Sequence, residues 1–215
     1  MKSDRLFKKN MMEEFWNNRY KKEEFVYGTE PNKFFKETIE KLNLKGDILL
    51  PAEGEGRNAV YASKKGLSVI AFDISVEGKN KAQKLANAAN VKIDYKVGEL
   101  HQLKFEPNSF DALALIYAHF PQNKKELNTQ LAALVKPNGY LILEGFSTEN
   151  LYYREKNPKI GGPSDINLLF TIEEIQTTFN NFETILLEQT EVELEEGDLH
   201  NGLANVIRYI GKKTV

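Results

Sequence analysis

The segment 48–59, ILLPAEGEGRNA, joins an apolar run to a glycine turn and a helix-compatible stretch. Gly54, Gly56 and Ala59 fit the pattern G-x-G-x-x-G/A, in which glycines let the backbone approach a ligand closely. Asp73 lies 17 positions beyond Gly56, about where an acidic side chain accepts hydrogen bonds from ribose hydroxyls. Glycine also occurs in such turns for steric reasons alone, but this order of residues favours a nucleotide site.

Glu53 and Glu55 lie inside this turn and separate the candidate nucleotides. A dinucleotide places a doubly negative pyrophosphate over the turn, and each carboxylate within about 6 Å would cost on the order of 1–3 kcal/mol. S-adenosylmethionine has no phosphate and carries a sulfonium and an ammonium, which nearby carboxylates suit. The two glutamates therefore favour S-adenosylmethionine over a nicotinamide dinucleotide.

The elements around this turn alternate between strands and helices, which is typical of βαβ units and a parallel sheet. Two strand-like runs at the end of the chain predict an antiparallel hairpin on that sheet. We therefore predict an α/β fold with a Rossmann-like seven-stranded sheet, mostly parallel with a C-terminal antiparallel hairpin, and helices on both faces. The predicted strands are 47–52, 67–73, 92–98, 109–118, 139–146, 183–195 and 201–211, and the predicted core helices are 56–65, 75–89 and 122–135.

The whole chain, residues 1–215, is interpreted as one domain with four parts. A helical cap segment over 1–45 precedes a cofactor-binding core over 46–146. A loop over 147–169, rich in proline and glycine near its middle, is long enough to act as a lid. A helix and the hairpin follow over 170–215.

Composition excludes several classes of function. The chain has no cysteine, and its three histidines are far apart, so we expect no metal site. The net charge of -2 shows no electrostatic footprint for nucleic acid. No apolar run approaches the roughly 20 residues that cross a bilayer, and the charged N-terminus lacks a signal core. We expect a soluble cytoplasmic protein without membrane or nucleic-acid partners; nothing in the sequence predicts its oligomeric state.

With its glycine turn and Asp73, the chain resembles class I S-adenosylmethionine-dependent methyltransferases, and most of all the small-molecule members of the tellurite-resistance and thiopurine methyltransferase type. The resemblance covers nearly the whole chain. It extends from Trp16-x-x-Arg19-Tyr20 and Tyr27-Gly28-Thr29 to the turn LVKPNGYL at 134–141. One departure is that Leu50 and Ala52 stand where the family usually has an acid and a glycine, so Glu53 is the candidate to hold the donor's ammonium.

The resemblance implies a cofactor site along the ends of the first four strands. Glu99 is expected at the adenine or ribose, although a solvated glutamate at a strand end is the alternative. The predicted cofactor-binding residues are Glu53, Gly54, Glu55, Gly56, Arg57, Asp73, Ile74, Gly98, Glu99, Leu100 and Ile116.

Acceptor-side candidates follow the fourth strand and lie in the cap and lid. Tyr117 and His119 are predicted to line the methyl-transfer pocket as catalytic residues, with His119 either a general base or a cap of the next helix. The predicted substrate residues are Trp16, Arg19, Tyr27, Tyr153 and Arg154, with simple anchoring of a helix as the alternative for Trp16. Glu195, Glu196 and His200 either face the same mouth or form a solvated turn.

The predicted reaction is methyl transfer to a small-molecule acceptor by in-line displacement. Such an enzyme must hold donor and acceptor about 3–3.5 Å apart in a dry pocket. A soft sulfur, selenium or tellurium nucleophile is favoured because it needs no general base. An NAD(P)-dependent oxidoreductase and a non-catalytic nucleotide-binding protein of the same fold are the alternatives.

Overall fold

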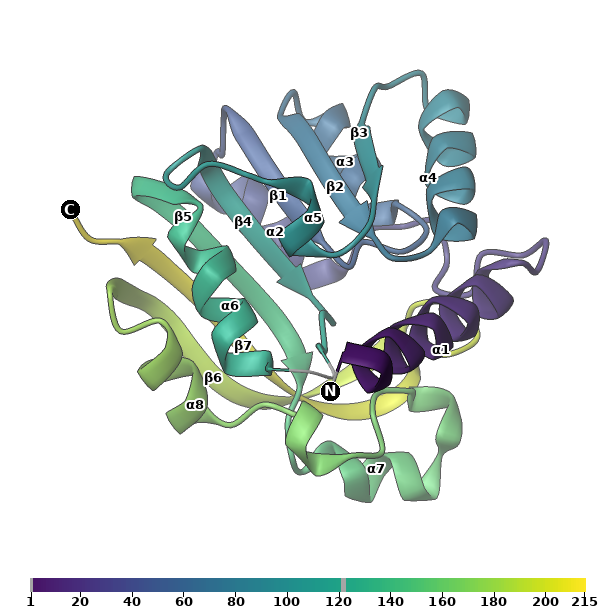
Figure 1. The fold of residues 1–215 in the computed structure, drawn as a ribbon. Helices are drawn as coiled ribbons and strands as arrows, with labels where there is room; N and C mark the ends of the chain where they lie inside the picture. Colours follow the sequence, from purple (N-terminus) through teal and green to yellow (C-terminus); the bar gives the residue numbers. More distant parts are fainter. Residues whose placement is uncertain (1, 121–122) are drawn as a thin grey trace.

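The computed structural model describes the backbone of residues 2–120 and 123–215, and the side chains of residues 10–120 and 123–215. Its strands form one seven-stranded sheet in the order β3-β2-β1-β4-β5-β7-β6 (Figure 1). The strands β1 to β5 run parallel, and β7 runs antiparallel between β5 and β6. This confirms the predicted fold. The strands are β1 (Asp47–Pro51), β2 (Ser68–Asp73), β3 (Asp94–Val97), β4 (Phe110–Ile116), β5 (Val135–Phe146), β6 (Phe182–Glu195) and β7 (Asn201–Lys213).

Helices cover both faces of the sheet (Figure 1). Leu49 and Leu113 pack toward α6 and α8, whereas Ile48 and Leu50 pack toward α2, α3 and α4. Because both faces are buried, the central strands read as continuous apolar runs. The helices are α1 (Lys2–Tyr20), α2 (Lys33–Leu42), α3 (Arg57–Lys64), α4 (Val76–Ala88), α5 (Leu100–Leu103), α6 (Lys124–Ala133), α7 (Asn150–Lys156) and α8 (Ile172–Thr178).

The strand order reverses between β1 and β4, which pair side by side in the middle of the sheet. Crossovers from β1 lead toward β2 and β3, and those from β4 lead toward β5. The loops that follow β1 and β4 therefore diverge at this point, and in open α/β sheets ligands bind in that crevice.

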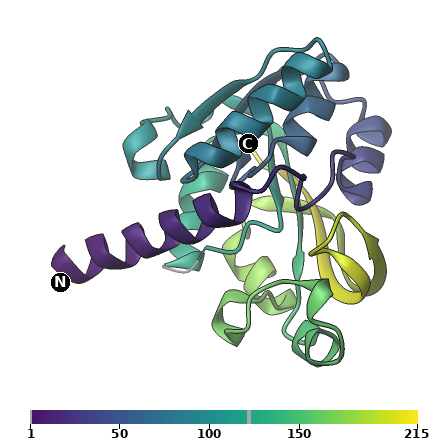
Figure 2. The same cartoon turned by 90° about the vertical axis from the view of Figure 1, so that its right-hand side faces the viewer.

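The helix α1 lies across this edge and packs against α4 with its C-terminal end. Its N-terminal part projects away from the body of the protein (Figure 2). Met11 and Phe15 are exposed, whereas Tyr20 in the last turn is buried. Within the described residues no helix is long and apolar enough to span a membrane.

Residues 147–169 differ from the single irregular loop that the sequence predicts. They contain α7 and two short 3-10 helices, Pro158–Ile160 and Ile166–Leu168. Ile160 and Leu169 are buried against Phe146 and Leu194 in a third apolar cluster. The prolines and glycines near the middle of this segment indicate a loop in the sequence, so the helical turns on either side were not predicted. The segment is thus largely packed on the C-terminal hairpin.

Candidate active site

The turn after β1 is a tightly wound loop, which we call the cofactor loop (residues 52–58). Ala52, Gly54 and Gly56 have positive φ values of 51°, 58° and 86°. The φ of Ala52 is one that glycine adopts most readily, which agrees with the glycine that the resembling family usually has there. A Cβ on Gly56 would lie 2.5 Å from the Cβ of Ala82 in α4, so this position needs glycine for helix packing.

The Asp73 carboxylate joins the end of β2 to the cofactor loop. It accepts hydrogen bonds from the backbone amides of Gly54 at 3.1 Å and Ser75 at 2.9 Å. Burial raises its pKa to about 6, although these amides act in the opposite direction. Each carboxylate oxygen has two lone pairs, so Asp73 keeps acceptor capacity for ribose hydroxyls. The predicted position of the ribose-binding acid is therefore compatible with this geometry.

The two glutamates of the cofactor loop point to different partners. Glu53 accepts from the amide of Ala59 in the first turn of α3 at 2.7 Å and from Asn58 Nδ2 at 3.4 Å. Burial raises the pKa of Glu53 to about 7. Glu55 instead accepts from the amides of Val26 and Tyr27 and pairs with Lys81 Nζ at 2.8 Å. Glu55 thus fastens the N-terminal segment to the loop.

Four rings from four segments meet beyond the cofactor loop, and we call Tyr27, Tyr117, Phe146 and His200 the aromatic wall. The centroid of the His200 ring lies 4.4 Å from that of Tyr117, 4.5 Å from Tyr27 and 5.3 Å from Phe146. Tyr117 directly follows β4 and has a φ of 52°. A bulky residue in the left-handed region is uncommon and marks strain of the kind found at functional sites.

A buried polar network lies behind this wall. Asn32 Nδ2 donates to Glu144 Oε1 at 2.6 Å and to Glu196 Oε1 at 2.9 Å. Glu144 also accepts from Tyr117 Oη at 2.9 Å and from Arg208 Nε at 2.7 Å. All the carboxylate oxygens of Glu144 and Glu196 therefore already have donors.

Glu196 makes the link from this network to the cofactor loop. Its Oε2 lies 2.7 Å from Arg57 Nη2 and 3.2 Å from His200 Nδ1. Burial favours the protonated form of Glu196, but Arg57 and His200 outweigh burial and bring its pKa to about 2. Burial lowers the pKa of His200, against the opposing effect of Glu196. Of the three hairpin-turn residues that were predicted either to face the mouth or to be solvated, His200 is buried, Glu196 is partly buried and Glu195 is exposed.

His119 is engaged on both ring nitrogens. Its Nδ1 lies 2.8 Å from the carbonyl oxygen of Leu168, and its Nε2 accepts from the amide of Phe146 at 3.2 Å. Burial lowers its pKa to about 4. In this arrangement His119 joins β5 to the 147–169 segment and has no nitrogen free to take a proton, which removes the geometric support for a general base.

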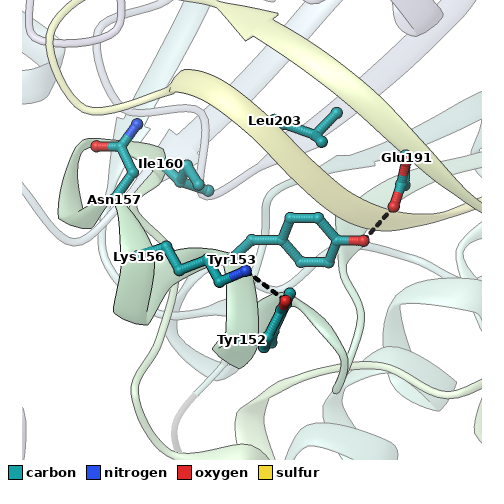
Figure 3. A pocket seen from close by; sticks show the side chains of 7 residues that line it. All are labelled: Tyr152, Tyr153, Lys156, Asn157, Ile160, Glu191 and Leu203. Carbon is teal, nitrogen blue, oxygen red and sulfur yellow. Dashed lines mark hydrogen bonds between the residues drawn. The ribbon is translucent and has the colours of Figure 1, made fainter.

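Predicted substrate residues divide into two groups. Arg19 Nη1 donates to Tyr27 Oη at 2.8 Å, and its guanidinium lies 4.9 Å from the ring centre of Trp16, so Arg19 and Trp16 adjoin the wall at Tyr27. Tyr153 instead turns toward β6, where its hydroxyl bonds to Glu191 beside a surface cavity of about 570 Å³ (Figure 3). Arg154 follows it on α7, with a buried Nε that has no partner among the described residues. The structure therefore does not bring Tyr153 to the cofactor loop.

The remaining predicted cofactor residues lie at the carboxyl ends of β2, β3 and β4. The amide of Gly98 donates to the carbonyl of Asp73 at 2.9 Å, and the amide of Glu99, at the start of α5, donates to Gln102 Oε1 at 2.9 Å. Ile74, Leu100 and Ile116 extend the same edge.

Asn32 and Glu144 belong to the buried network but were not among the predicted residues. One signal was available for Glu144. It is a single carboxylate within the otherwise apolar strand run 140–146, and such a group must be paired when buried.

Comparison with known proteins agrees with the fold and the cofactor loop. Residues 48–139 match the family described as methyltransferase domain. None of the curated proteins matches this sequence significantly. This family match includes the whole cofactor loop and Asp73.

Solved structures share the fold at low sequence identity. A SAM-dependent methyltransferase from Methanosarcina mazei is 19% identical, with a TM-score of 0.62 over 79% of this chain and 92% of that one. TehB from Haemophilus influenzae is 13% identical, with a TM-score of 0.67 over 94% of this chain and 67% of that one. A structure determined for the conversion of a disulfide bond into a thioacetal group during echinomycin biosynthesis is 15% identical, with a TM-score of 0.74 over 94% and 92%.

Proposed function

We propose that this chain, whose residues 48–139 match the family described as methyltransferase domain, transfers a methyl group from S-adenosylmethionine to an anionic, soft small-molecule acceptor. The observation that carries this proposal is the pattern of charge around the cofactor loop and the aromatic wall. The buried carboxyl groups of the loop suit a cationic donor, and Arg19 with the Tyr27 hydroxyl, at one side of the wall, suits an anionic acceptor.

The residues of the cofactor loop fit S-adenosylmethionine. The hydrogen-bond partners of Glu53 and Asp73 are backbone amides and one asparagine, all neutral. Two buried carboxyl groups without cationic partners in hydrogen-bond contact suit a sulfonium and an ammonium. Glu53 and the Gly54 backbone would hold the methionine end, and Asp73 the ribose. When bound, the donor supplies a methyl group on a positively charged sulfur, and that carbon–sulfur bond breaks as the acceptor bonds to the carbon.

A dinucleotide fits this loop poorly. The amides at a helix N-terminus are the usual binding site for a pyrophosphate. Here the amide of Ala59 already binds the Glu53 carboxyl group, which would have to be displaced. This geometry weighs against the oxidoreductase alternative.

The aromatic wall supports an anionic acceptor. Arg19 lies among aromatic rings, and the Tyr27 hydroxyl accepts from Arg19 and so keeps its own proton to donate. In contrast, Glu55, Glu144 and Glu196 accept hydrogen bonds from two or more groups each and are not available to a cationic amine. A thiolate or a selenium or tellurium oxyanion matches this arrangement.

The engagement of His119 also supports a soft nucleophile. A hydroxyl or amine acceptor must lose a proton during methyl transfer, whereas an anionic sulfur, selenium or tellurium acceptor has none to lose. The wall then needs only to orient the acceptor and exclude water. Among the structural neighbours, the one from echinomycin biosynthesis concerns sulfur chemistry, which agrees with this acceptor class.

Calorimetric titration with S-adenosylmethionine and with NADH tests the donor. We expect micromolar binding of the first and none of the second, and a loss of affinity of at least tenfold in Asp73→Asn. Asp94→Asn is the matched control, because Asp94 is exposed, pairs with Lys96 and begins β3, at the end of the strand opposite Gly98. Donor binding without turnover of any thiol, selenite or tellurite would favour the non-catalytic alternative instead.

A further inference from the structure

The turn between β6 and β7 reaches the cofactor loop, although 139 positions separate Glu196 from Arg57. The amide of Asp198 donates to the carbonyl of Val26 at 3.0 Å, and a Cβ on Gly197 would lie 2.5 Å from that oxygen. The turn is therefore pressed against the N-terminal segment, and the side chain of Glu196, 12% exposed, lies where three parts of the site meet.

Each oxygen of the Glu196 carboxylate has a different task. Oε2 binds Arg57 at 2.7 Å, and Arg57 begins α3 directly after the glycines of the cofactor loop. The same oxygen holds His200 Nδ1 at 3.2 Å, which orients one ring of the aromatic wall. Oε1 accepts from Asn32 at 2.9 Å, and Asn32 in turn binds Glu144 beneath Tyr117.

We propose that Glu196 is a positioning residue for methyl transfer, which keeps the donor side and the acceptor side of the site in a fixed relation. This inference rests on the proposed function. Glu196 acts through Arg57 toward the donor and through His200 and Asn32 toward the acceptor. Its carboxylate contacts the cofactor loop through the side chain of Arg57 and the aromatic wall through the ring of His200.

The energetics favour a role in geometry. Arg57 is only 7% exposed, so removing the Glu196 charge leaves a buried guanidinium without its carboxylate partner and allows it to shift about its remaining bond to the Tyr27 carbonyl. A misplacement of about 1 Å at the reacting centre can cost about 100-fold in rate. In the proposed donor site Glu53, Gly54 and Asp73 hold the donor, whereas the hydrogen bonds of Glu196 among the described residues go to Asn32, Arg57 and His200.

The test is a double-variant cycle with Glu196→Gln and Arg57→Gln, measured with S-adenosylmethionine and a thiol acceptor. We expect kcat per donor-binding site to fall ten- to hundredfold in each single variant, with the dissociation constant of the donor changed by less than about threefold in Glu196→Gln. The double variant should be no slower than the slower single variant, because both changes break one connection. Glu195→Gln, next along the chain and exposed, should match the wild type.

Calorimetric stoichiometry counts the folded sites, so loss of stability does not mimic loss of rate. The double variant leaves neither charge buried alone and keeps the test valid where a single variant unfolds. If kcat of Glu196→Gln equals that of the wild type, or if the rate losses multiply in the double variant, the positioning role of Glu196 is overturned while the proposed function stands. Wild-type protein that binds the donor but methylates no acceptor would overturn the proposed function, and this inference with it.

Discussion

The carboxyl group of Glu53 accepts a hydrogen bond of 2.7 Å from the amide of Ala59, so the cofactor loop caps the first turn of α3 with its own side chain. This cap is buried, and burial raises the pKa of Glu53 from its ordinary 4.5 to about 7. The loop therefore holds a carboxyl group that gives up its proton near neutral pH, where a cationic donor would favour the ionised form.

Replacing Glu53 with Gln should stabilise the ligand-free protein at high pH. The folded state holds the Glu53 proton more tightly than the unfolded chain, so this group's stabilisation is complete below about pH 4.5 and lost as the pH rises through about 7. A shift of this size corresponds to about 3 kcal/mol. We expect the free energy of unfolding of Glu53→Gln to exceed that of the wild type at pH 8 and to match it near pH 5.

Urea denaturation of both proteins at pH 5 and pH 8 measures this difference. A second measurement is the affinity for the donor: Glu53→Gln should bind S-adenosylmethionine more weakly than the wild type at pH 8. An equal difference in unfolding free energy at the two pH values would show that the Glu53 carboxyl group is not the source.

Gly56→Ala should destabilise the protein far more than Gly66→Ala. Both glycines have a φ of 86°, so both substitutions carry the same backbone penalty, which is of order 1 kcal/mol. A Cβ at Gly56 would also lie 2.8 Å from the Cα of Ala82, whereas a Cβ at Gly66 meets nothing within 4 Å. Thermal unfolding of the two variants separates the backbone penalty from the steric contact with Ala82. Equal melting temperatures would mean that α4 shifts to accept the Cβ without loss of stability.

The regular elements were predictable because their signals are local. Strand burial on both faces produces apolar runs such as 48–50, and the cofactor loop needs glycine at positions that the sequence shows directly. The predicted edges of β1 to β4 agree with the structure to within about two residues, whereas β5 begins at Val135, four residues before the predicted start at 139.

The buried network was not predictable in the same way. Asn32, Glu144 and Glu196 are 112 and 52 positions apart along the chain, and only the closure of the sheet and hairpin brings them together. His119 illustrates the converse. Its position after β4 is that of a catalytic group, yet the packing of 147–169 supplies the Leu168 carbonyl that engages it.

His119→Ala should reduce stability without changing the pH dependence of catalysis. The substitution leaves the amide of Phe146 and the carbonyl of Leu168 without partners, at a cost of about 1–3 kcal/mol for each group. Because the pKa of His119 lies at about 4, its ring stays neutral from pH 6 to pH 8. The profile of kcat/KM over this range should keep its shape, and loss of a limb with a pKa near 6.5 would identify His119 as a base after all.

Arg19→Gln should weaken binding of the acceptor and leave binding of the donor nearly unchanged. A charge-assisted hydrogen bond contributes about 1.5–3 kcal/mol, so we expect KM for an anionic thiol or tellurite to rise ten- to hundredfold. The dissociation constant of S-adenosylmethionine should change by less than about threefold. Lys22→Gln removes the same charge from an exposed position two residues beyond α1 and controls for the general field. If the donor constant rises while KM for the acceptor stays the same, Arg19 binds the methionine carboxylate instead, and the proposed anionic acceptor loses its main support.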